Sequence, residues 1–247
     1  MKAVGLYRYL PITDDDSLVD AVIEIPEPTG RDVLVAVRAI SVNPVDTKVR
    51  APKEKTETEP RVLGWDAAGE VVATGADVQH YAVGDRVFYA GDITRSASNS
   101  GYQLVDERIV GRAPATLDFA QAAALPLTSI TAWEALFDRL GISRAGKDAG
   151  KTILIIGGAG GVGSIAIQLA SRIAQLTVIA TASRPESGDW VKKLGADHVV
   201  NHRHALDVEL RSIGVPTVDY ILCLNNTVQH WTAMANAIAP QGRICSI

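Results

Sequence analysis

Short apolar segments alternate with turn-forming glycines and prolines over residues 1–115. In the segment 33–40, Val33, Val35 and Val37 occupy every second position, which is the pattern of a half-buried strand. The strands predicted in this way cover residues 3–7, 19–25, 33–40, 68–73, 85–89 and 102–105. Many short strands separated by turns predict a barrel-like β domain.

The segment 52–60 breaks this pattern, because it contains almost nothing apolar. Its charged residues are Lys53, Glu54, Lys55, Glu57 and Glu59. We predict an exposed loop there, with no function attached to it.

The spacing of apolar residues becomes helical from residue 117. Ala132, Leu136 and Leu140 recur every four residues and predict a helix over 129–140 that ends at Gly141. Strands are then predicted over 153–156, 177–180, 198–200, 218–222 and 243–247, with helices over 162–173, 186–194, 205–213 and 228–238. This alternation predicts a parallel, doubly wound sheet. We therefore expect an α/β protein with a strand-rich domain over 1–125 and a dinucleotide-binding domain over 126–247.

The predicted parallel sheet has five strands, whereas a complete dinucleotide-binding fold has six. The segment 243–247 ends the sequence on a strand. We therefore expect a truncated form of a longer chain. An unpaired edge strand invites association, so a homodimer is one possible assembly.

Composition narrows the function classes. The 247 residues are 47% hydrophobic and 21% charged, which is typical of a folded globular chain. A net charge of −4 gives no basic excess for a nucleic-acid partner. The uncharged run 152–171 contains five glycines within 157–163, so it predicts a strand, a turn and a helix in place of a membrane span. With two cysteines, Cys223 and Cys245, predicted as inert core thiols, and no signal peptide, we expect a cytoplasmic protein.

The strongest local motif is the glycine-rich segment 157–163. Gly158, Gly160 and Gly163 match G-x-G-x-x-G between a predicted strand and a predicted helix. Such a turn brings the backbone close to a pyrophosphate at a helix N-terminus, so Gly161 and Val162 belong to the predicted cofactor site as well. A purely structural turn is the alternative, and the repeated strand–helix context favours the cofactor.

The residues after the second strand of this unit favour NADPH. An NAD site places an acid about 20 residues after the glycines, but Ala182 stands there and the first acid is Glu186. Ser183 and Arg184 can donate hydrogen bonds to a 2′-phosphate. The alternative is that Arg184 is simply a surface residue.

Four motifs in order carry a family resemblance: the segments 43–48, 63–69, 83–87 and 157–163. The chain resembles medium-chain dehydrogenases/reductases, in particular the quinone oxidoreductase (zeta-crystallin-like) and zinc-type alcohol dehydrogenase-like branch. The resemblance covers essentially the whole chain and implies a GroES-like catalytic domain, a Rossmann domain and an active site in the cleft between them. Family chains extend beyond this one.

The same resemblance argues against zinc. Alcohol dehydrogenases of the superfamily place a cysteine where Asn43 stands and a histidine where Trp65 stands. Neither Asn43 nor Trp65 is a suitable zinc ligand, and the cysteines of the structural zinc lobe are missing. A site formed by His198, His202 and His204 is the weaker metal alternative. We expect no metal.

The resemblance also suggests which side chains lie near the nicotinamide. It places Asn43 beside the nicotinamide ribose and the substrate, Thr131 near the nicotinamide, and His202 near the adenosine ribose. Lys48 can stabilise an oxyanion or deliver a proton, with Asp46 beside it. The alternatives are a solvated lysine and a turn-forming aspartate. We expect Trp65 and Tyr89 to serve packing.

These features predict a zinc-independent, NADPH-dependent oxidoreductase. Without a Lewis acid, an electrophilic quinone or α,β-unsaturated carbonyl is an easier small-molecule substrate than an alcohol. A non-catalytic NADPH-binding fragment or module is the alternative from another class. A zinc-dependent alcohol dehydrogenase is less favoured.

Overall fold

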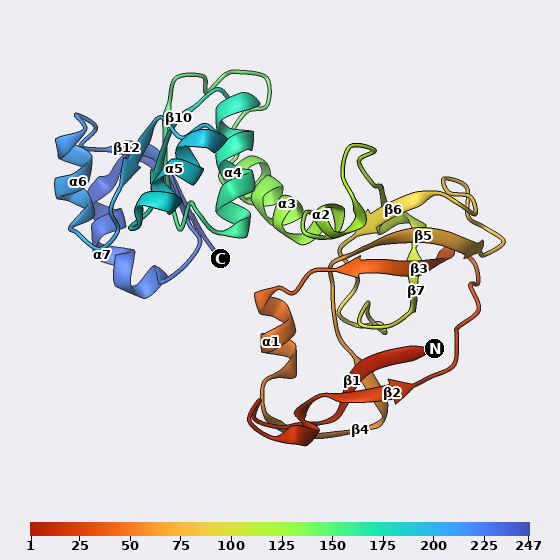
Figure 1. Cartoon of the computed structure of the whole chain (residues 1–247). Coiled ribbons are helices and arrows are strands. Elements are labelled where there is room, and N and C mark those ends of the chain that lie inside the picture. The colour runs from red at the N-terminus through yellow and green to blue at the C-terminus, as the bar shows by residue number, and fades with distance from the viewer. The chain divides into compact units, whose positions relative to one another are not determined.

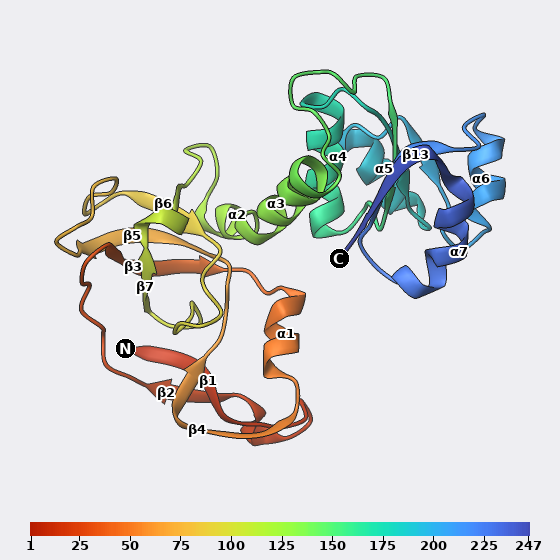
Figure 2. The same cartoon turned by 180° about the vertical axis from the view of Figure 1, so that it is seen from behind.

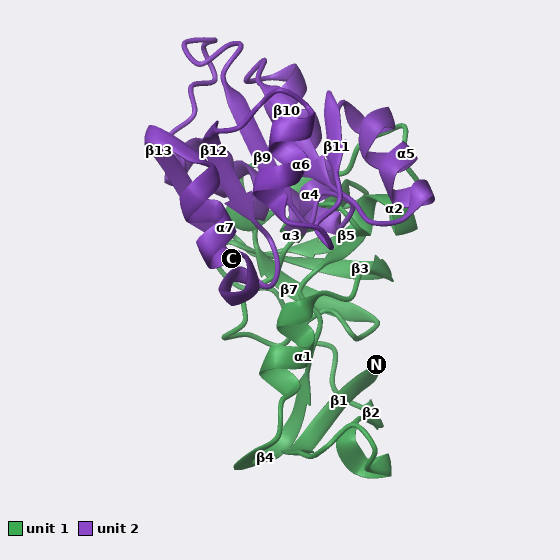
Figure 3. Cartoon of the chain, turned by 90° about the vertical axis from the view of Figure 1, so that its left-hand side faces the viewer, with its two compact units in different colours: residues 1–127 green, residues 128–247 purple.

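A computed structural model describes all residues, 1–247, and they divide into two compact units, 1–127 and 128–247 (Figure 3). Each unit has its own sheets and its own apolar core. The two units are described separately below.

Two antiparallel sheets form the framework of the first unit (Figure 1). The larger sheet has the order β7-β3-β5-β6-β8 and the smaller one the order β2-β1-β4. The strands are β1 (Lys2–Tyr9), β2 (Val19–Val22), β3 (Asp32–Ile40), β4 (Lys53–Val62), β5 (Ala67–Thr74), β6 (Arg86–Tyr89), β7 (Tyr102–Asp106) and β8 (Gly111–Arg112). The helices are α1 (Pro44–Arg50) and α2 (Phe119–Ala123), with short 3₁₀ turns at Asp15–Ser17 and Glu107–Ile109.

The central strand β3 differs from its predicted half-buried pattern. Val33 and Val35 are fully buried as expected, but Leu34 and Ala36 on the opposite face are buried as well. Strand β3 lies inside the sheet, paired with β5 on one side and β7 on the other, and the burial of Leu34 and Ala36 shows that its second face is covered along this stretch too.

The predicted loop at 52–60 is wrong, because β4 runs through it. This strand pairs antiparallel with β1, with register shifts near Arg8. Its charged side chains are exposed except for those of Glu57 and Arg61, which are half-buried, and the Lys53 ammonium lies 4.1 Å from the centre of the Tyr9 ring. Backbone pairing and contacts of this kind stabilise the strand. Because it has no alternating apolar residues, the sequence pattern does not predict it.

A five-stranded parallel sheet organises the second unit in the order β11-β10-β9-β12-β13, which confirms the predicted doubly wound arrangement. Its strands are β9 (Thr152–Ile156), β10 (Thr177–Thr181), β11 (His198–Val200), β12 (Val218–Cys223) and β13 (Ile238–Ser246). The helices of this part are α3 (Pro126–Trp133), α4 (Gly161–Arg172), α5 (Pro185–Leu194), α6 (Leu206–Ser212) and α7 (Thr227–Ala237). Helix α3 begins at the end of the first unit.

Both faces of this sheet are buried under helices. Ile153 and Ile155 pack with α4 on one face, while Leu154 and Ile156 pack with α6 and α7 on the other. Figures 1 and 2 show α6 and α7 on the side of the sheet opposite to α4. None of the helices combines the length and the apolar character needed to cross a membrane.

Two details of the second unit correct the sequence prediction. The helix expected over 129–140 is divided, because α3 is followed by a π-helix over Glu134–Arg139, in which the Leu140 N–H donates to the Ala135 carbonyl. Cys223 is fully buried as expected, but Cys245 is only half-buried, because β13 is an edge strand of the sheet.

Candidate functional site

The glycine turn joins β9 to α4, and its backbone is packed so closely that Gly158 and Gly163 leave no room for a Cβ. A Cβ on Gly163 would lie 2.5 Å from the carbonyl oxygens of Gly157 and Gly158, and one on Gly158 would lie 2.8 Å from the Cβ of Ala180. The positive φ of 85° falls on Gly157, one residue before the first glycine of the G-x-G-x-x-G motif. Gly158 and Gly163 instead allow α4 to approach the sheet.

Gly160 has a different role from these two glycines. It is the N-cap of α4, with extended backbone angles that any residue can adopt, and a Cβ there would meet only the Gly157 oxygen, at 3.4 Å. Gly160 and Gly161 are exposed, whereas Val162 is half-buried against the core. The first N–H groups of a helix have no partners within the helix, so the start of α4 is a ready anion site.

Thr181 supports this turn and was missed by sequence reasoning. It ends β10, is 1% exposed, and its Oγ1 accepts the Gly157 N–H at 2.9 Å. A threonine at the end of a buried strand gives no signal of its own. Only the pairing of β10 with β9 brings its hydroxyl to the turn.

The residues that follow β10 present hydrogen-bond donors and no negative charge until Glu186. Ala182 is buried, Ser183 is half-buried, and Arg184 is exposed at the N-cap of α5. The Arg184 guanidinium has no hydrogen-bond or ion-pair partner in the structure, so all its donors are available. Neither Ala182 nor Ser183 carries a negative charge that would repel a phosphate.

The histidines beyond β11 do not form a metal site. His204 is bonded through Nδ1 to Glu209 Oε1 at 2.9 Å, while the Nδ1 atom of half-buried His202 is buried without a partner. A further histidine that the sequence did not single out, His230 on α7, lies close enough to His202 to be affected by its charge. Burial lowers the pKa of His230, and the charge of His202 lowers it further.

Thr131, the predicted nicotinamide contact, is half-buried on α3. It lies one helical turn after Thr128, whose methyl group would be 3.0 Å from a Cβ on Gly161. This part of α3 therefore borders the first turn of α4.

In the first unit, Asn43, Asp46 and Asp66 form one buried polar group. Asn43 is the N-cap of α1, and its backbone N–H donates to Asp46 Oδ2 at 2.6 Å. Its side-chain Nδ2 donates to Asp66 Oδ2 at 2.9 Å, and the other Asp66 oxygen accepts the Leu127 N–H at 3.0 Å. Burial raises the pKa of Asp66 from its ordinary value of 3.8 to about 6, although these two hydrogen bonds oppose the shift.

Asp46 therefore has a clear structural task, since it caps α1, while Lys48 has none. Lys48 is exposed on α1, and no hydrogen bond or ion pair holds its ammonium group. Trp65 and Tyr89 are 1% and 2% exposed, so both pack in the core. Burial also raises the pKa of Tyr89, which keeps its phenol neutral.

A zinc ion does not fit the residues at this place. The Asn43 amide directs its NH₂ group at Asp66, and the indole of Trp65 cannot ligate a metal. No group of three or more His, Cys, Asp or Glu side chains lies close enough together to hold a metal ion.

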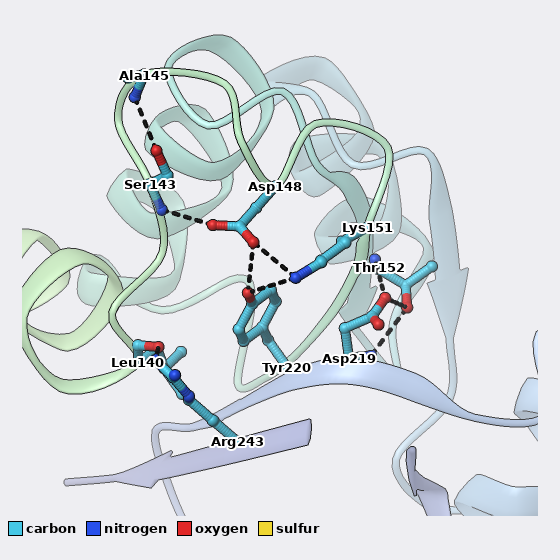
Figure 4. A network of polar contacts seen from close by, with 9 residues as sticks. All are labelled: Leu140, Ser143, Ala145, Asp148, Lys151, Thr152, Asp219, Tyr220 and Arg243. Carbon is cyan, nitrogen blue, oxygen red and sulfur yellow. Dashed lines mark hydrogen bonds and ion pairs between the residues drawn. The ribbon is translucent and has the colours of Figure 1, made fainter. Parts of the chain in front are cut away.

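A second polar cluster lies in the second unit, at the edge of the parallel sheet where β9 and β12 begin (Figure 4). The glycine turn lies at the other end of β9. Asp148 accepts hydrogen bonds from Lys151 Nζ at 2.7 Å and from Tyr220 Oη at 2.9 Å, and its other oxygen accepts the Ser143 N–H. These bonds tie the loop before β9 to β12. A cleft of about 310 Å³ opens beside them, lined in part by Asp219 and Arg243. These hydrogen bonds give the cluster a structural role, namely to hold the loop before β9 against β12.

Comparison with known proteins agrees with this organisation. Residues 29–126 match the family described as "Alcohol dehydrogenase GroES-like domain", and residues 161–247 match "Zinc-binding dehydrogenase". A zinc-type alcohol dehydrogenase-like protein of Staphylococcus aureus is 50% identical over 248 residues, which cover 100% of this chain and 73% of the relative.

Two further proteins extend the comparison. A crystal structure from Rhizobium etli, named provisionally as a zinc-dependent alcohol dehydrogenase, is 54% identical with a TM-score of 0.94, over 100% of this chain and 72% of that one. The NADPH-dependent alkenal/one oxidoreductase of Arabidopsis thaliana is 37% identical over 190 residues, or 73% of this chain and 47% of the relative. The chain belongs to the medium-chain dehydrogenase/reductase superfamily, in the zinc-type alcohol dehydrogenase-like group, a family of oxidoreductases that bind nicotinamide cofactors.

Proposed function

We propose that the protein is a zinc-independent reductase that uses NADPH to reduce a quinone or an α,β-unsaturated carbonyl. The observation that carries the proposal is the glycine turn, in which Gly158 and Gly163 are used for packing while Gly160 leaves the N-terminus of α4 open. That division of roles suits a pyrophosphate lying against Gly160, Gly161 and Val162.

The phosphate-specific part of the proposal rests on Ser183 and Arg184. An exposed guanidinium without a carboxylate partner, placed beside a hydroxyl, suits the 2′-phosphate of NADPH. His202, with its buried and unpartnered Nδ1, is a third candidate contact at the adenosine end. The name of the Arabidopsis relative, an NADPH-dependent alkenal/one oxidoreductase, supports this choice of cofactor and of an enone.

The reacting end is proposed to lie at Asn43, Thr131 and Lys48. NADPH, when bound, would supply the hydride for an electrophilic carbon of the substrate, whose oxygen would then need a group to stabilise its negative charge. Asn43 and Thr131 would orient the nicotinamide. The free ammonium group of Lys48 would stabilise the oxyanion of the substrate and donate a proton to it, and solvent would then reprotonate Lys48. Asp46 acts through its cap of α1, which fixes Asn43 and the first turn that precedes Lys48.

The test is NADPH oxidation followed with a panel of quinones and enones, with allylic and saturated alcohols tested for oxidation by NADP⁺. We expect turnover with the electrophilic acceptors and none with the alcohols. The variant Lys48→Met should lower kcat about a hundredfold, because it removes the proton donor. Lys53→Met is the matched control, since Lys53, on β4, is also exposed but lies over the ring of Tyr9. Full activity of Lys48→Met would contradict this role for Lys48.

A further inference from the structure

Asp66 is completely buried, and each of its carboxylate oxygens accepts a hydrogen bond. One oxygen accepts from Asn43 Nδ2, and the other accepts from the N–H of Leu127, the second residue of α3. A single side chain thus connects the start of α1 with the start of α3. Removing a partner from such a pair leaves a buried polar group unsatisfied.

The backbone that carries Asp66 is held firmly. Gly64 has a φ of 101°, and a Cβ there would lie 2.4 Å from Asn99 Oδ1 and 2.7 Å from Ser98 Oγ. The Ser98 N–H donates to the Gly64 carbonyl at 3.0 Å, and the Asn99 N–H donates to the Leu63 carbonyl at 2.8 Å. The segment before Asp66 therefore has little freedom to shift.

The chemistry of this contact decides which way the Asn43 amide faces. A carboxylate only accepts hydrogen bonds, so it selects the amide orientation in which the NH₂ group points toward it. The carbonyl oxygen Oδ1 of Asn43 must then face away from Asp66. An amide without such a partner could adopt both orientations.

We propose that Asp66 is a positioning residue for Asn43, which turns the amide so that Oδ1 is offered as the acceptor to a hydrogen-bond donor of the bound nucleotide, such as a ribose hydroxyl. This inference rests on the proposed function, in which Asn43 contacts the cofactor. The Asp66 carboxylate accepts from Asn43 and from the Leu127 N–H, while its backbone carbonyl accepts the Ser41 N–H. Its effect on the reaction therefore passes through the orientation of one amide.

The first experiment measures hydrogen exchange of the Asn43 side-chain amide in the absence of any cofactor. In ¹⁵N-labelled protein, the Asn43 side-chain NH₂ resonances are assigned from their loss in Asn43→Asp, and their hydrogen exchange is measured. We expect slow exchange in the unmutated chain, exchange at least tenfold faster in Asp66→Asn, and recovery in Asp66→Glu. The control Asp77→Asn removes an exposed carboxylate of the same unit and should change nothing.

The second experiment measures NADPH binding by fluorescence and the kinetics of enone reduction. Asp66→Asn should weaken NADPH binding about tenfold and raise the KM for NADPH, with Asp66→Glu intermediate. Unchanged amide exchange in Asp66→Asn would overturn the proposal, and so would altered exchange with unchanged NADPH binding. If the unmutated chain failed to bind NADPH, the proposed function would fall instead, and the amide data would still report separately on the Asp66–Asn43 contact.

Discussion

Replacing Asp66 with asparagine should flatten the pH dependence of unfolding of the first unit. The pKa of Asp66 rises to about 6 in the folded state, chiefly because the side chain is buried, with a contribution from the nearby charge of Asp46. A raised folded pKa means that the stabilising contribution is complete below the unfolded pKa and is lost as the pH rises through about 6. The whole shift corresponds to about 3 kcal/mol, of which about 2 kcal/mol falls between pH 4 and pH 7.

The assay is urea unfolding at several pH values between about 4 and 7. The transition of the first unit must be told apart from that of the second. Trp65 is the one tryptophan of the first unit, so its fluorescence reports on that unit once Trp133, Trp190 and Trp231 are replaced by phenylalanine in every variant. The unmutated chain should lose about 2 kcal/mol more than Asp66→Asn does over this range, and Asp77→Asn should follow the unmutated chain. Parallel pH profiles for the unmutated chain and Asp66→Asn would refute the assignment of a raised pKa to Asp66.

Three further predictions concern the cofactor and the metal. Gly160→Ala should keep the melting temperature but lower NADPH affinity at least tenfold. Gly163→Ala should destabilise the second unit by about 1–3 kcal/mol, because its Cβ would meet two carbonyl oxygens. Equal melting temperatures of the two variants would contradict these roles. Arg184→Ala should weaken NADPH binding about ten- to a hundredfold and leave NADH binding nearly unchanged in titration calorimetry, and equal losses would mean that the phosphate lies elsewhere. Elemental analysis after dialysis should find no stoichiometric zinc, and one zinc per chain that is lost on mutation of Asn43 or Asp66 would contradict the argument from the donor set.

The second unit could be predicted closely because its signals are local. The apolar run of β9 followed by five glycines predicts the strand, the turn and the start of α4 to within a residue. Burial of alternate residues of β9 on both faces also agrees with an uninterrupted apolar strand between two layers of helices.

The first unit was predicted less completely, because some of its structure depends on contacts far apart in the sequence. Strand β4 has no apolar pattern and forms by pairing with β1. Helix α1 has only seven residues, too short to show a helical period, and the Asp46 cap indicates it better than hydrophobicity does.

The candidate site shows the same limit. Asn43 could be selected from its motif, but its contact with Asp66 spans 23 residues and that of Asp66 with Leu127 spans 61. In the sequence, Asp66 is only one residue of the segment 63–69 that carries part of the family resemblance. Its task as an acceptor for two donors becomes visible only when the three segments are folded together.

The most direct test of the proposed function is kcat/KM for NADPH and for NADH, measured with the same enone after dialysis against a chelator. We expect turnover that needs no added metal and a preference for NADPH of at least about tenfold, as proposed from binding of the 2′-phosphate by Arg184 and Ser183. Equal kcat/KM for the two cofactors, or activity that returns only on addition of zinc, would contradict it.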